Sequence, residues 1–433
     1  MAETKKLGSD KSPRHWLILV VCCAASLCGV GLASNTYGVF LPFIVQDTGW
    51  ATSQVSIFMT VSAWSTMAFY FVGAKVLSRF NTKVVTVIGG LGVCIGLFLL
   101  STVTQVWHLY LCTFLIGTSL AFCALNIIPL LINNWFIKHR NLVMGISYVF
   151  TSVAGAIFNP LFASLSVAHG WRYTYRIAAC IGLIYVVLAL LFVAGKPSDV
   201  GLRPYGISES EEMKDVKDQV EIKEFPGIPA KYAFKTATFW FILLFVVTNS
   251  FCTGFNQHWV NLGVTSGFDP VTAATLTTIG MISSSIFKIV EGRMSDSKFG
   301  IMKTAIVCSI VPLISMILLI IAGTASYGVV AVACFLFGVG IAMTQLMPPQ
   351  LVRDMYGMRS YSTLYPIAFM AMSLGTGFTY TLHGVFIQAA GSYMGSFIFN
   401  SCCYVVGIIV LTIGFKMSKA AKAKYWREVG EAI

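Results

Sequence analysis

The chain has 433 residues, of which 57% are hydrophobic and only 11% are charged, and its mean hydropathy is +0.79. An ordinary soluble domain has about 25% charged residues, so this composition indicates an integral membrane protein. The formal net charge of +12 would suit an anionic partner such as nucleic acid, but the positions of the basic residues, given below, argue against one.

Apolar stretches that can cross a core of about 30 Å as helices follow one another along nearly the whole chain. The sequence predicts twelve spans, and the first is too long for a cleaved signal sequence, so we expect it to be retained. The predicted spans are 16–44, 52–78, 83–103, 106–134, 141–168, 172–195, 236–264, 270–294, 302–323, 326–352, 360–389 and 392–417.

The basic residues fall on one side of the predicted membrane. If the amino terminus is inside, all of the 29 Lys and Arg residues lie on the inner side except Arg172, Arg176 and Lys288. This bias predicts that both termini are cytoplasmic, as expected for a multi-pass protein of the cytoplasmic (plasma) membrane, the inner membrane in a bacterial cell. A lipid bilayer is therefore the expected surrounding, and nucleic acid is not an expected partner.

The long polar stretch 196–235 separates six spans from six others. We expect a cytoplasmic amino-terminal tail over 1–15, a six-helix bundle over 16–195, a linker over 196–235, a second bundle over 236–417 and a tail over 418–433. The twelve cysteines all fall within spans and lack metal-ligand spacing, so no metal site and no cofactor are expected.

The two halves carry an internal repeat. "LIGTSLAFCALNIIP" from Leu115 aligns with "LFGVGIAMTQLMPPQ" from Leu336, which pairs Gly117 with Gly338 at an offset of 221. "GAKVLSRFNTK" from Gly73 aligns with "GRMSDSKFGIM" from Gly292 at an offset of 219. Two matches at nearly equal offsets predict an all-α protein built from two pseudo-symmetric six-helix bundles.

At this point the sequence resembles the major facilitator superfamily, whose loop between spans two and three reads Gly-x-x-x-Asp-x-x-x-Gly-x-x-Lys. The resemblance implies that this loop is a conformational latch. The second half fits the pattern, whereas the first half has Leu77 and Asn81 in place of the Asp and the second Gly. The expected latch residues are Gly292, Arg293, Asp296, Gly300 and Lys303, with Gly73 and Arg79 in the first half.

Within that superfamily the sequence is similar to monocarboxylate transporters and their oxalate/formate antiporter relatives. The similarity is carried by "NTYGVFLPFIVQDTGWATSQVS" from Asn35, by "NNWFIKHRNLVMGIS" ending at Ser147, and by "GRMSD" from Gly292. Lys288 stands four residues before Gly292, where this family has a substrate-binding arginine. The resemblance therefore implies that Lys288 contacts an anionic group, although a lysine lacks the two-pronged grip of arginine on a carboxylate.

Glu291 lies one helical turn from Lys288, and with Thr277 and Ser284 the two residues lie within reach of one helix face. Burying a lone charge at mid-membrane is costly, so Lys288 needs a partner. Three interpretations remain open: contact with substrate or coupling ion, an internal Lys288–Glu291 pair, or a lysine that extends to the inner headgroups. Glu291 and His258 are the candidates for proton coupling.

Further candidates come from spans that line the cavity in this superfamily and from the eleventh span. The candidate substrate-binding residues are Lys288, Ser284, Asn35, Tyr37, Asn126, Asn256, Gln345 and Tyr365. Buried amides often only join helices, so packing stays an alternative for each of them. Between Arg359 and Lys416 the only basic residue is His383, whereas the relatives that carry oxalate have a lysine in the eleventh span. The resemblance therefore favours a monoanion, a zwitterion or a bulkier weak acid over oxalate.

We expect a secondary active transporter of a small, monocarboxylate-like organic anion, working by alternating access with proton symport or anion exchange. Its expected partners are that substrate and protons or a counter-anion, and it is expected to be monomeric. The sequence shows no acid–base pair, nucleotide-binding loop or metal-ligand cluster of the kind that would indicate an enzyme. Two alternatives remain open: an exporter of amphipathic or hydrophobic compounds in the same fold, and a non-transporting membrane sensor or scaffold.

Overall fold

The computed structural model describes residues 12–137, 140–206, 228–357 and 361–429, and these residues are almost entirely helical. The chain divides into two compact units, the first made of Met1–Phe43 and Val61–Lys223 and the second of Ile44–Thr60 and Glu224–Ile433. The predicted tails and the predicted linker lie partly outside the described residues.

The first span is a helix of changing pitch. Its pieces are α1 (Pro13–Ala24), the π-helical η1 (Ala25–Gly31), α2 (Leu32–Ser34) and α3 (Tyr37–Thr48). Ser12 caps α1, because its hydroxyl accepts a hydrogen bond from the Arg14 amide at 3.4 Å. A β-carbon at Gly31 would lie 2.2 Å from Cβ of Ala154 on α8, so glycine lets the widened turn approach α8 closely.

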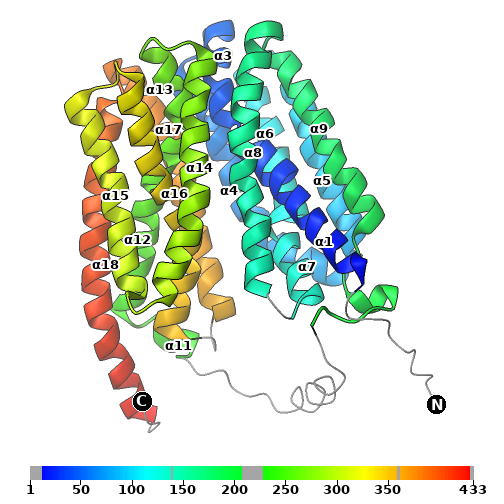
Figure 1. Cartoon of the computed structure of the whole chain (residues 1–433), viewed down its shortest axis with the longest axis vertical. Helices are drawn as coiled ribbons and strands as arrows, with labels where there is room; N and C mark the ends of the chain where they lie inside the picture. The colour runs from blue at the N-terminus through cyan, green and yellow to red at the C-terminus, as the bar shows by residue number, and fades with distance from the viewer. Residues whose placement is uncertain (1–11, 138–139, 207–227, 358–360, 430–433) are drawn as a thin grey trace. The chain divides into compact units, whose positions relative to one another are not determined.

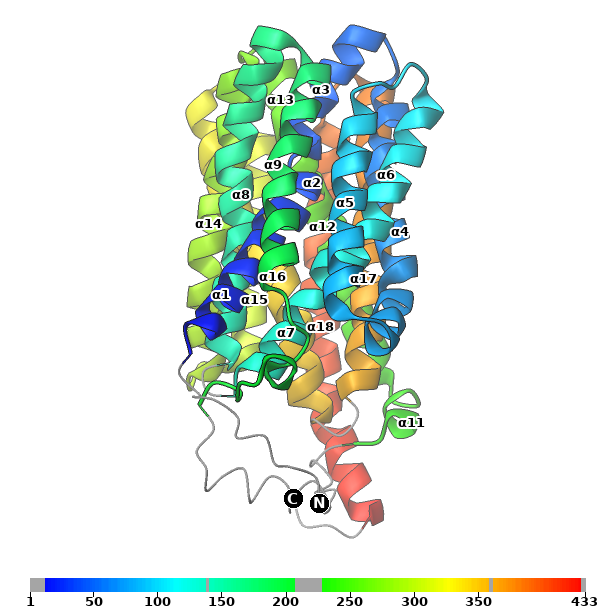
Figure 2. The same cartoon turned by 90° about the vertical axis from the view of Figure 1, so that its right-hand side faces the viewer.

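The remaining spans of the first half follow in order (Figure 1), and residues 52–60 of the first of them belong to the second unit. They are α4 (Thr52–Arg79), α5 (Thr82–Leu100), α6 (Val106–Leu120) continued by the π-helical η2 (Ala121–Leu125) and α7 (Ile127–Trp135), α8 (Arg140–His169) and α9 (Trp171–Phe192). A short turn, η3 (Pro197–Val200), comes after α9. Figure 2 shows α1, α8 and α9 side by side, as their contacts require.

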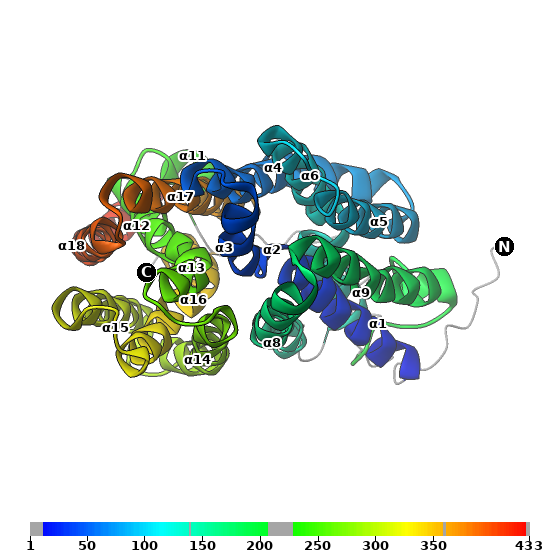
Figure 3. The same ribbon diagram turned by 90° about the horizontal axis from the view of Figure 1, so that it is seen from above.

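The second unit repeats this plan, and α14, α15 and α16 are neighbours in the view of Figure 3. Its helices are the short α11 (Ala230–Ala233), α12 (Ala237–Thr253) continued by the 3₁₀-helical η4 (Gly254–His258) and α13 (Trp259–Thr265), α14 (Pro270–Asp296), α15 (Gly300–Ala322), α16 (Tyr327–Tyr356), α17 (Tyr361–Ala390) and α18 (Met394–Val429). In each unit we call the end that carries Arg79, or Arg293 and Arg353, the basic end.

Equivalent glycines make equivalent helix contacts in the two units. A β-carbon at Gly117 would lie 2.3 Å from the Ser62 carbonyl oxygen on α4, and one at Gly338 would lie 2.5 Å from the Gly280 carbonyl oxygen on α14. Each contact also has a hydroxyl-to-carbonyl hydrogen bond, from Thr66 to Gly117 at 2.9 Å and from Ser283 to Phe335 at 2.5 Å. The fourth span of each half therefore crosses the second span at a position that only glycine fits.

The polar stretch between the units is anchored to each unit by backbone hydrogen bonds. On the first unit the Tyr205 amide donates to the Trp135 carbonyl at 2.8 Å, and the Ile137 amide donates to the Tyr205 carbonyl at 3.1 Å. On the second unit the Ile228 amide donates to the Tyr356 carbonyl at 2.9 Å. Trp135 and Tyr356 end the fourth span of their own halves, so the two anchors occupy equivalent positions.

The predicted fold class is confirmed: two sets of six long helical segments match the predicted spans. Ten of them are long and apolar enough to cross a membrane, and α4 and α17 have comparable lengths of 28 and 30 residues. The largest difference in span bounds is at the carboxy terminus, where α18 continues to Val429 instead of ending near 417. The added residues are rich in Ala and Lys, which favour helix.

Candidate functional site

The polar stripe of the eighth span lies on α14, a regular helix with a strong start. The Asp269 carboxylate accepts hydrogen bonds from the amides of Val271 and Thr272, and Pro270 occupies the first helical position. These hydrogen bonds, with one from the Thr272 side chain first among them, lower the pKa of Asp269. The helix then runs unbroken to the basic end of the second unit.

The four polar residues of this stripe are buried, while the opposite face of α14 is exposed and apolar. Thr277, Ser284, Lys288 and Glu291 are 4%, 0%, 9% and 0% exposed. Ile282, Ile286 and Ile289 on the opposite face are each about half exposed. A hydrocarbon-facing surface opposite a buried polar stripe is the pattern of a membrane helix that turns its charges toward protein.

Lys288 and Glu291 are two buried ionisable side chains that lie close enough to interact. The two side chains interact electrostatically, and the Cys308 thiol on α15 faces the carboxylate. Within the described residues neither carboxylate oxygen of Glu291 has a hydrogen bond of normal geometry. A buried carboxylate lacking its hydrogen bonds is costly, so this pair is poised to accept a proton or to change partners.

Ser284 adds an open polar group one turn from Lys288. Its hydroxyl is buried and has no hydrogen-bond partner among the described residues. Most other buried hydroxyls of α14 bond to the helix itself or to a neighbour, for example Thr277 to the Ala274 carbonyl at 2.7 Å and Ser283 to the Phe335 carbonyl at 2.5 Å. Ser284, Lys288 and Glu291 therefore form a buried polar group of residues, here called the α14 site, in which the oxygens of Ser284 and Glu291 have no hydrogen-bond partner among the described residues.

The predicted residues of the first unit are largely occupied by structural hydrogen bonds. The Asn35 amide donates to the Thr151 carbonyl at 2.8 Å, and the Tyr37 hydroxyl is 3.1 Å from that of Ser62. Asn126 donates to the carbonyls of Tyr70 and Ala121 at 2.9 and 2.8 Å. Asn35 and Asn126 thus join spans, and Asn126 closes the end of η2, where the widened turn frees a carbonyl.

In the seventh span Asn249 and Asn256 are seven residues apart, which would place them on one face of a regular helix, but η4 changes the helix pitch between them. Asn249 donates to the Thr344 hydroxyl at 2.8 Å. Asn256 is half-buried, and its side-chain oxygen has no hydrogen-bond partner within the described residues. Asn256 is therefore a candidate with an available acceptor, and the 3₁₀ turn is what places it there.

Gln345 and Tyr365 lie in different surroundings. Gln345 is exposed on α16, three residues before the Pro348–Pro349 pair inside that helix. Tyr365 on α17 is half-buried against the hydrophobic cluster that also contains Cys308. The substrate-contact prediction for both residues remains a prediction.

His258 is held by hydrogen bonds at both ring nitrogens. Its Nε2 lies 2.9 Å from the Tyr380 carbonyl and its Nδ1 lies 3.1 Å from the Tyr393 hydroxyl. That hydroxyl also accepts a bond from the Asn261 amide at 2.7 Å. Because a carbonyl can only accept, Nε2 carries a proton, and in the neutral ring Nδ1 accepts from the Tyr393 hydroxyl. A second proton on His258 would reverse this bond and leave the Tyr393 O–H without its acceptor.

The predicted latch residues lie at the basic ends. Arg293 and Lys303 are exposed, Gly300 has a φ of +78° at the start of α15, and a β-carbon at Gly292 would meet no neighbour within 4 Å. The side chain of Asp296 lies outside the described part of the structure.

The first-half latch residues show a different packing. Arg79 is exposed, but a β-carbon at Gly73 would lie 2.9 Å from the Ala121 carbonyl oxygen and 2.8 Å from the Asn126 amide nitrogen. Gly73 is therefore required for close packing against η2, whereas Gly292 has free space around it.

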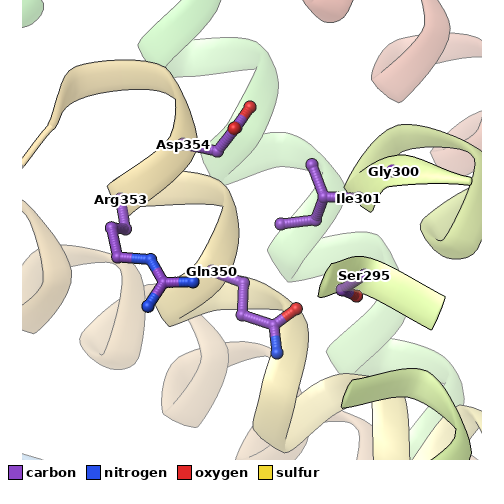
Figure 4. Close-up of a pocket in the computed structure, with 6 residues that line it drawn as sticks. All are labelled: Ser295, Gly300, Ile301, Gln350, Arg353 and Asp354. Carbon is purple, nitrogen blue, oxygen red and sulfur yellow. The ribbon is translucent and has the colours of Figure 1, made fainter. Parts of the chain in front are cut away.

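A pocket of about 370 Å³ opens beside the second-half latch. It is lined by Ser295, Gly300, Ile301, Gln350, Arg353 and Asp354. In Figure 4 the Arg353 side chain extends beside Gln350, whereas Asp354 points away from both. This pocket lies past the end of the polar stripe and does not include Lys288, so it is distinct from the α14 site.

Sequence reasoning missed two features of the second unit. Cys308 faces Glu291 from another helix. The two residues are 17 positions apart in the sequence, and helical spacing does not predict a contact across that separation. His383 is fully buried with both ring nitrogens lacking hydrogen-bond partners among the described residues. Its presence in the eleventh span was visible in the sequence, but its lack of partners was not.

Comparison with known proteins yields one family model over most of the chain. The model described as the Major Facilitator Superfamily matches residues 23–379. Among curated proteins, monocarboxylate transporter 13 from Rattus norvegicus is 23% identical over 88% of this chain and 80% of its own length. Agnestins efflux protein AgnL12 from Paecilomyces divaricatus is 28% identical, but that match spans only 46% of each chain.

Solved structures share the fold at low sequence identity. The D-xylose–proton symporter matches with a TM-score of 0.71 and 14% identity, over 93% of this chain and 97% of the other. A bacterial homologue of the human lysosomal transporter Spinster, in an inward-facing and occupied conformation, matches with a TM-score of 0.68 and 13% identity, over 96% and 98% of the two chains.

Proposed function

The chain belongs to the Major Facilitator Superfamily, and on that premise we propose that it is a secondary active transporter of a small organic monoanion. Transport proceeds by alternating access, with the anion carried together with a proton or exchanged for another anion. The buried α14 site binds the carboxylate of the substrate. The single observation that carries the proposal is the burial of Lys288 beside a carboxylate that lacks hydrogen bonds.

The chemistry of the site favours entry of the anion together with a proton. Lys288 needs a negative partner at this depth, and Glu291 is the acid one turn away. If Glu291 takes a proton, its attraction for Lys288 falls, and a substrate carboxylate replaces it beside the ammonium group. One anion and one proton then enter together, so the net charge of the site does not change.

The charge inventory favours a monoanion. Apart from Lys288, the basic side chains of the predicted spans are confined to their ends, and the eleventh span has only His383. A dianion such as oxalate would leave one negative charge without a cation. The likeness to monocarboxylate transporter 13 supports a carboxylate substrate.

A second candidate function is export of amphipathic compounds. It is favoured by the likeness to an efflux protein over 206 residues and by the 32 Phe and 17 Met residues of the chain. In that case the anion contact would contribute little, and removing the charge of Lys288 would leave transport nearly intact.

For either substrate we propose the cytoplasmic membrane with both termini in the cytoplasm, since the basic residues gather on that side. We also propose that the protein catalyses no covalent step, because members of this transporter family are not enzymes in general.

Uptake of labelled lactate and benzoate into proteoliposomes tests the proposal. Losing a hydrogen bond to a charged group costs about 1.5–3 kcal/mol, so Lys288→Gln should raise the KM about 10- to 150-fold. Lys288→Arg keeps the positive charge and should retain most of the affinity. Lys235→Gln, which neutralises an exposed lysine just before α12, is the matched control and should behave like the wild type.

A second variant separates the two transport modes. Glu291→Gln cannot release or take up a proton, so it should lose uptake driven by a proton gradient and keep exchange of internal for external anion. If wild-type protein moves neither probe by either mode, the proposed function is wrong. If Lys288→Gln transports an uncharged amphiphile as well as the wild type does but never a carboxylate, the export alternative gains support as a second activity.

A further inference from the structure

His383 is a buried titratable residue that the α14 site does not use. It lies on α17 seven residues before that helix ends, toward the end of the second unit opposite its basic end. Its side chain is 0% exposed, and neither ring nitrogen has a hydrogen-bond partner among the described residues. A buried polar group left without a partner destabilises the fold, so a histidine at this position is unfavourable unless it has a function.

The surroundings of His383 are mainly aromatic. The ring centroid of Phe255 lies 5.1 Å away at an interplanar angle of 87°, and those of Phe386 and Phe399 lie 6.3 and 6.2 Å away. The Phe251 carbonyl on α12 faces the imidazole, but outside normal hydrogen-bond geometry. The start of α4 packs on the neighbouring Gly384 with the uncharged Ser53 and Ser56.

His258 is the titratable group that faces His383, at a ring-centroid distance of 5.6 Å. Its two nitrogens are already bonded to Tyr380 and Tyr393. A proton that binds His258 therefore displaces the Tyr393 O–H from Nδ1, whereas one that binds His383 displaces no hydrogen bond among the described residues. The two histidines therefore differ in how readily they can bind a further proton, although they have the same side chain.

A protonated His383 would carry two N–H donors and a positive charge. Aromatic faces stabilise a buried cation, but this interaction does not replace the hydration that the cation loses on burial. A carboxylate within reach would accept one of these donors and neutralise the charge. The proton and the anion are therefore each unfavourable alone at this position and favourable together.

We propose that His383 is a proton-binding residue of the transport cycle, neutral in this conformation and protonated when an anionic substrate reaches it. This inference rests on the proposed transport of a monoanion and adds a second contact for that anion. The proton comes from water on the side from which the anion enters, and the only covalent change is the formation and later loss of one imidazole N–H bond. A monoanion and a proton together carry no net charge.

Imidazole NMR of the full-length protein labelled at histidine tests this inference. The chain has only six histidines, and His383→Gln identifies the His383 signal; if that variant does not fold, assigning the other five by single variants identifies it by elimination. Between pH 5 and 8, the range in which histidine titrates, His383 should show a neutral ring in chloride and a doubly protonated ring with excess lactate or benzoate. His258 should stay neutral in both.

Transport measurements separate this inference from the proposed function. His383→Gln should weaken the dependence of uptake on a proton gradient, whereas the matched His169→Gln variant, which changes an exposed histidine, should keep it. If anions are transported and the His383 signal stays neutral with every probe, the inference is wrong and the proposed function stands. If the signal becomes protonated with an anion but no flux occurs, His383 binds its proton together with an anion, but the proposed transport function fails and with it the place of His383 in a transport cycle.

Discussion

The glycine at the crossing of the second and fourth spans gives a test whose size follows from the structure. In Gly117→Ala the new β-carbon would lie 2.3 Å from the Ser62 carbonyl oxygen and 2.1 Å from the Ser65 hydroxyl oxygen. The hydroxyl can rotate away, but the carbonyl belongs to the backbone of α4. To restore an ordinary contact of 3.4 Å, the two helices must separate by about 1 Å, since close-packed interiors do not absorb such overlaps.

Overpacking of this kind costs about 1–3 kcal/mol, and the Thr66 hydrogen bond to the Gly117 carbonyl, worth about 0.5–1.5 kcal/mol, would be stretched as well. Alanine in place of glycine returns up to about 1 kcal/mol of helix propensity. We therefore expect Gly117→Ala to destabilise the protein by roughly 1–3 kcal/mol, and Gly338→Ala to do the same through the Gly280 carbonyl.

Thermal unfolding of purified protein, followed by the change in intrinsic fluorescence, measures this effect. Gly292→Ala is the matched control, because a β-carbon there meets nothing within 4 Å and the substitution should be neutral or slightly stabilising. Equal melting temperatures for Gly117→Ala and Gly292→Ala would refute the reasoning, since the two positions differ in space and not in residue type.

Three further predictions concern single polar groups. Asn126→Ala removes two hydrogen bonds and should lower stability by about 1–3 kcal/mol, whereas Asn256→Ala, whose side-chain oxygen is unpartnered, should change stability little and weaken substrate affinity in uptake assays. Tyr393→Phe leaves His258 Nδ1 and the Asn261 amide without their shared partner, so its melting temperature should fall. Asp269→Ala should remove the protection of the first turn of α14 against hydrogen exchange. The pKa of Asp269 is lowered in the folded protein, so in the wild type this protection should be complete above about pH 4. It should vanish as the pH falls through the lowered pKa.

The architecture could be predicted from the sequence because the length of the apolar stretches and the placement of the charges each depend on many residues together. Most predicted span bounds agree with the helices within a few residues, as for 106–134 against Val106–Trp135. Repeated glycines were visible as a pattern, and Gly117 and Gly338 do sit at equivalent helix crossings. Local pitch was not predictable, because η1, η2 and η4 depend on which carbonyls find side-chain partners after packing.

Single contacts of the site were predictable only where they lie on one helix. Ser284, Lys288 and Glu291 share α14, so helical spacing places them together. The Cys308 contact and the unpartnered state of His383 depend on other helices, and spacing within one segment carries no information about them. In the same way Asn35 and Asn126 looked available in the sequence, yet their amides bond to backbone carbonyls.

The anchors of Tyr205 on the fourth span of the first unit, and of Ile228 on that of the second, bear on how this protein can be engineered. Each half holds its own stub of the connecting segment by backbone hydrogen bonds, so neither anchor depends on the residues between 207 and 227. A fluorescent reporter inserted in that interval, or a protease site placed there, leaves the hydrogen bonds of Tyr205 and of Ile228 in place. The two halves can thus be tagged, or expressed as separate chains, without removing the hydrogen bonds that finish their fourth spans.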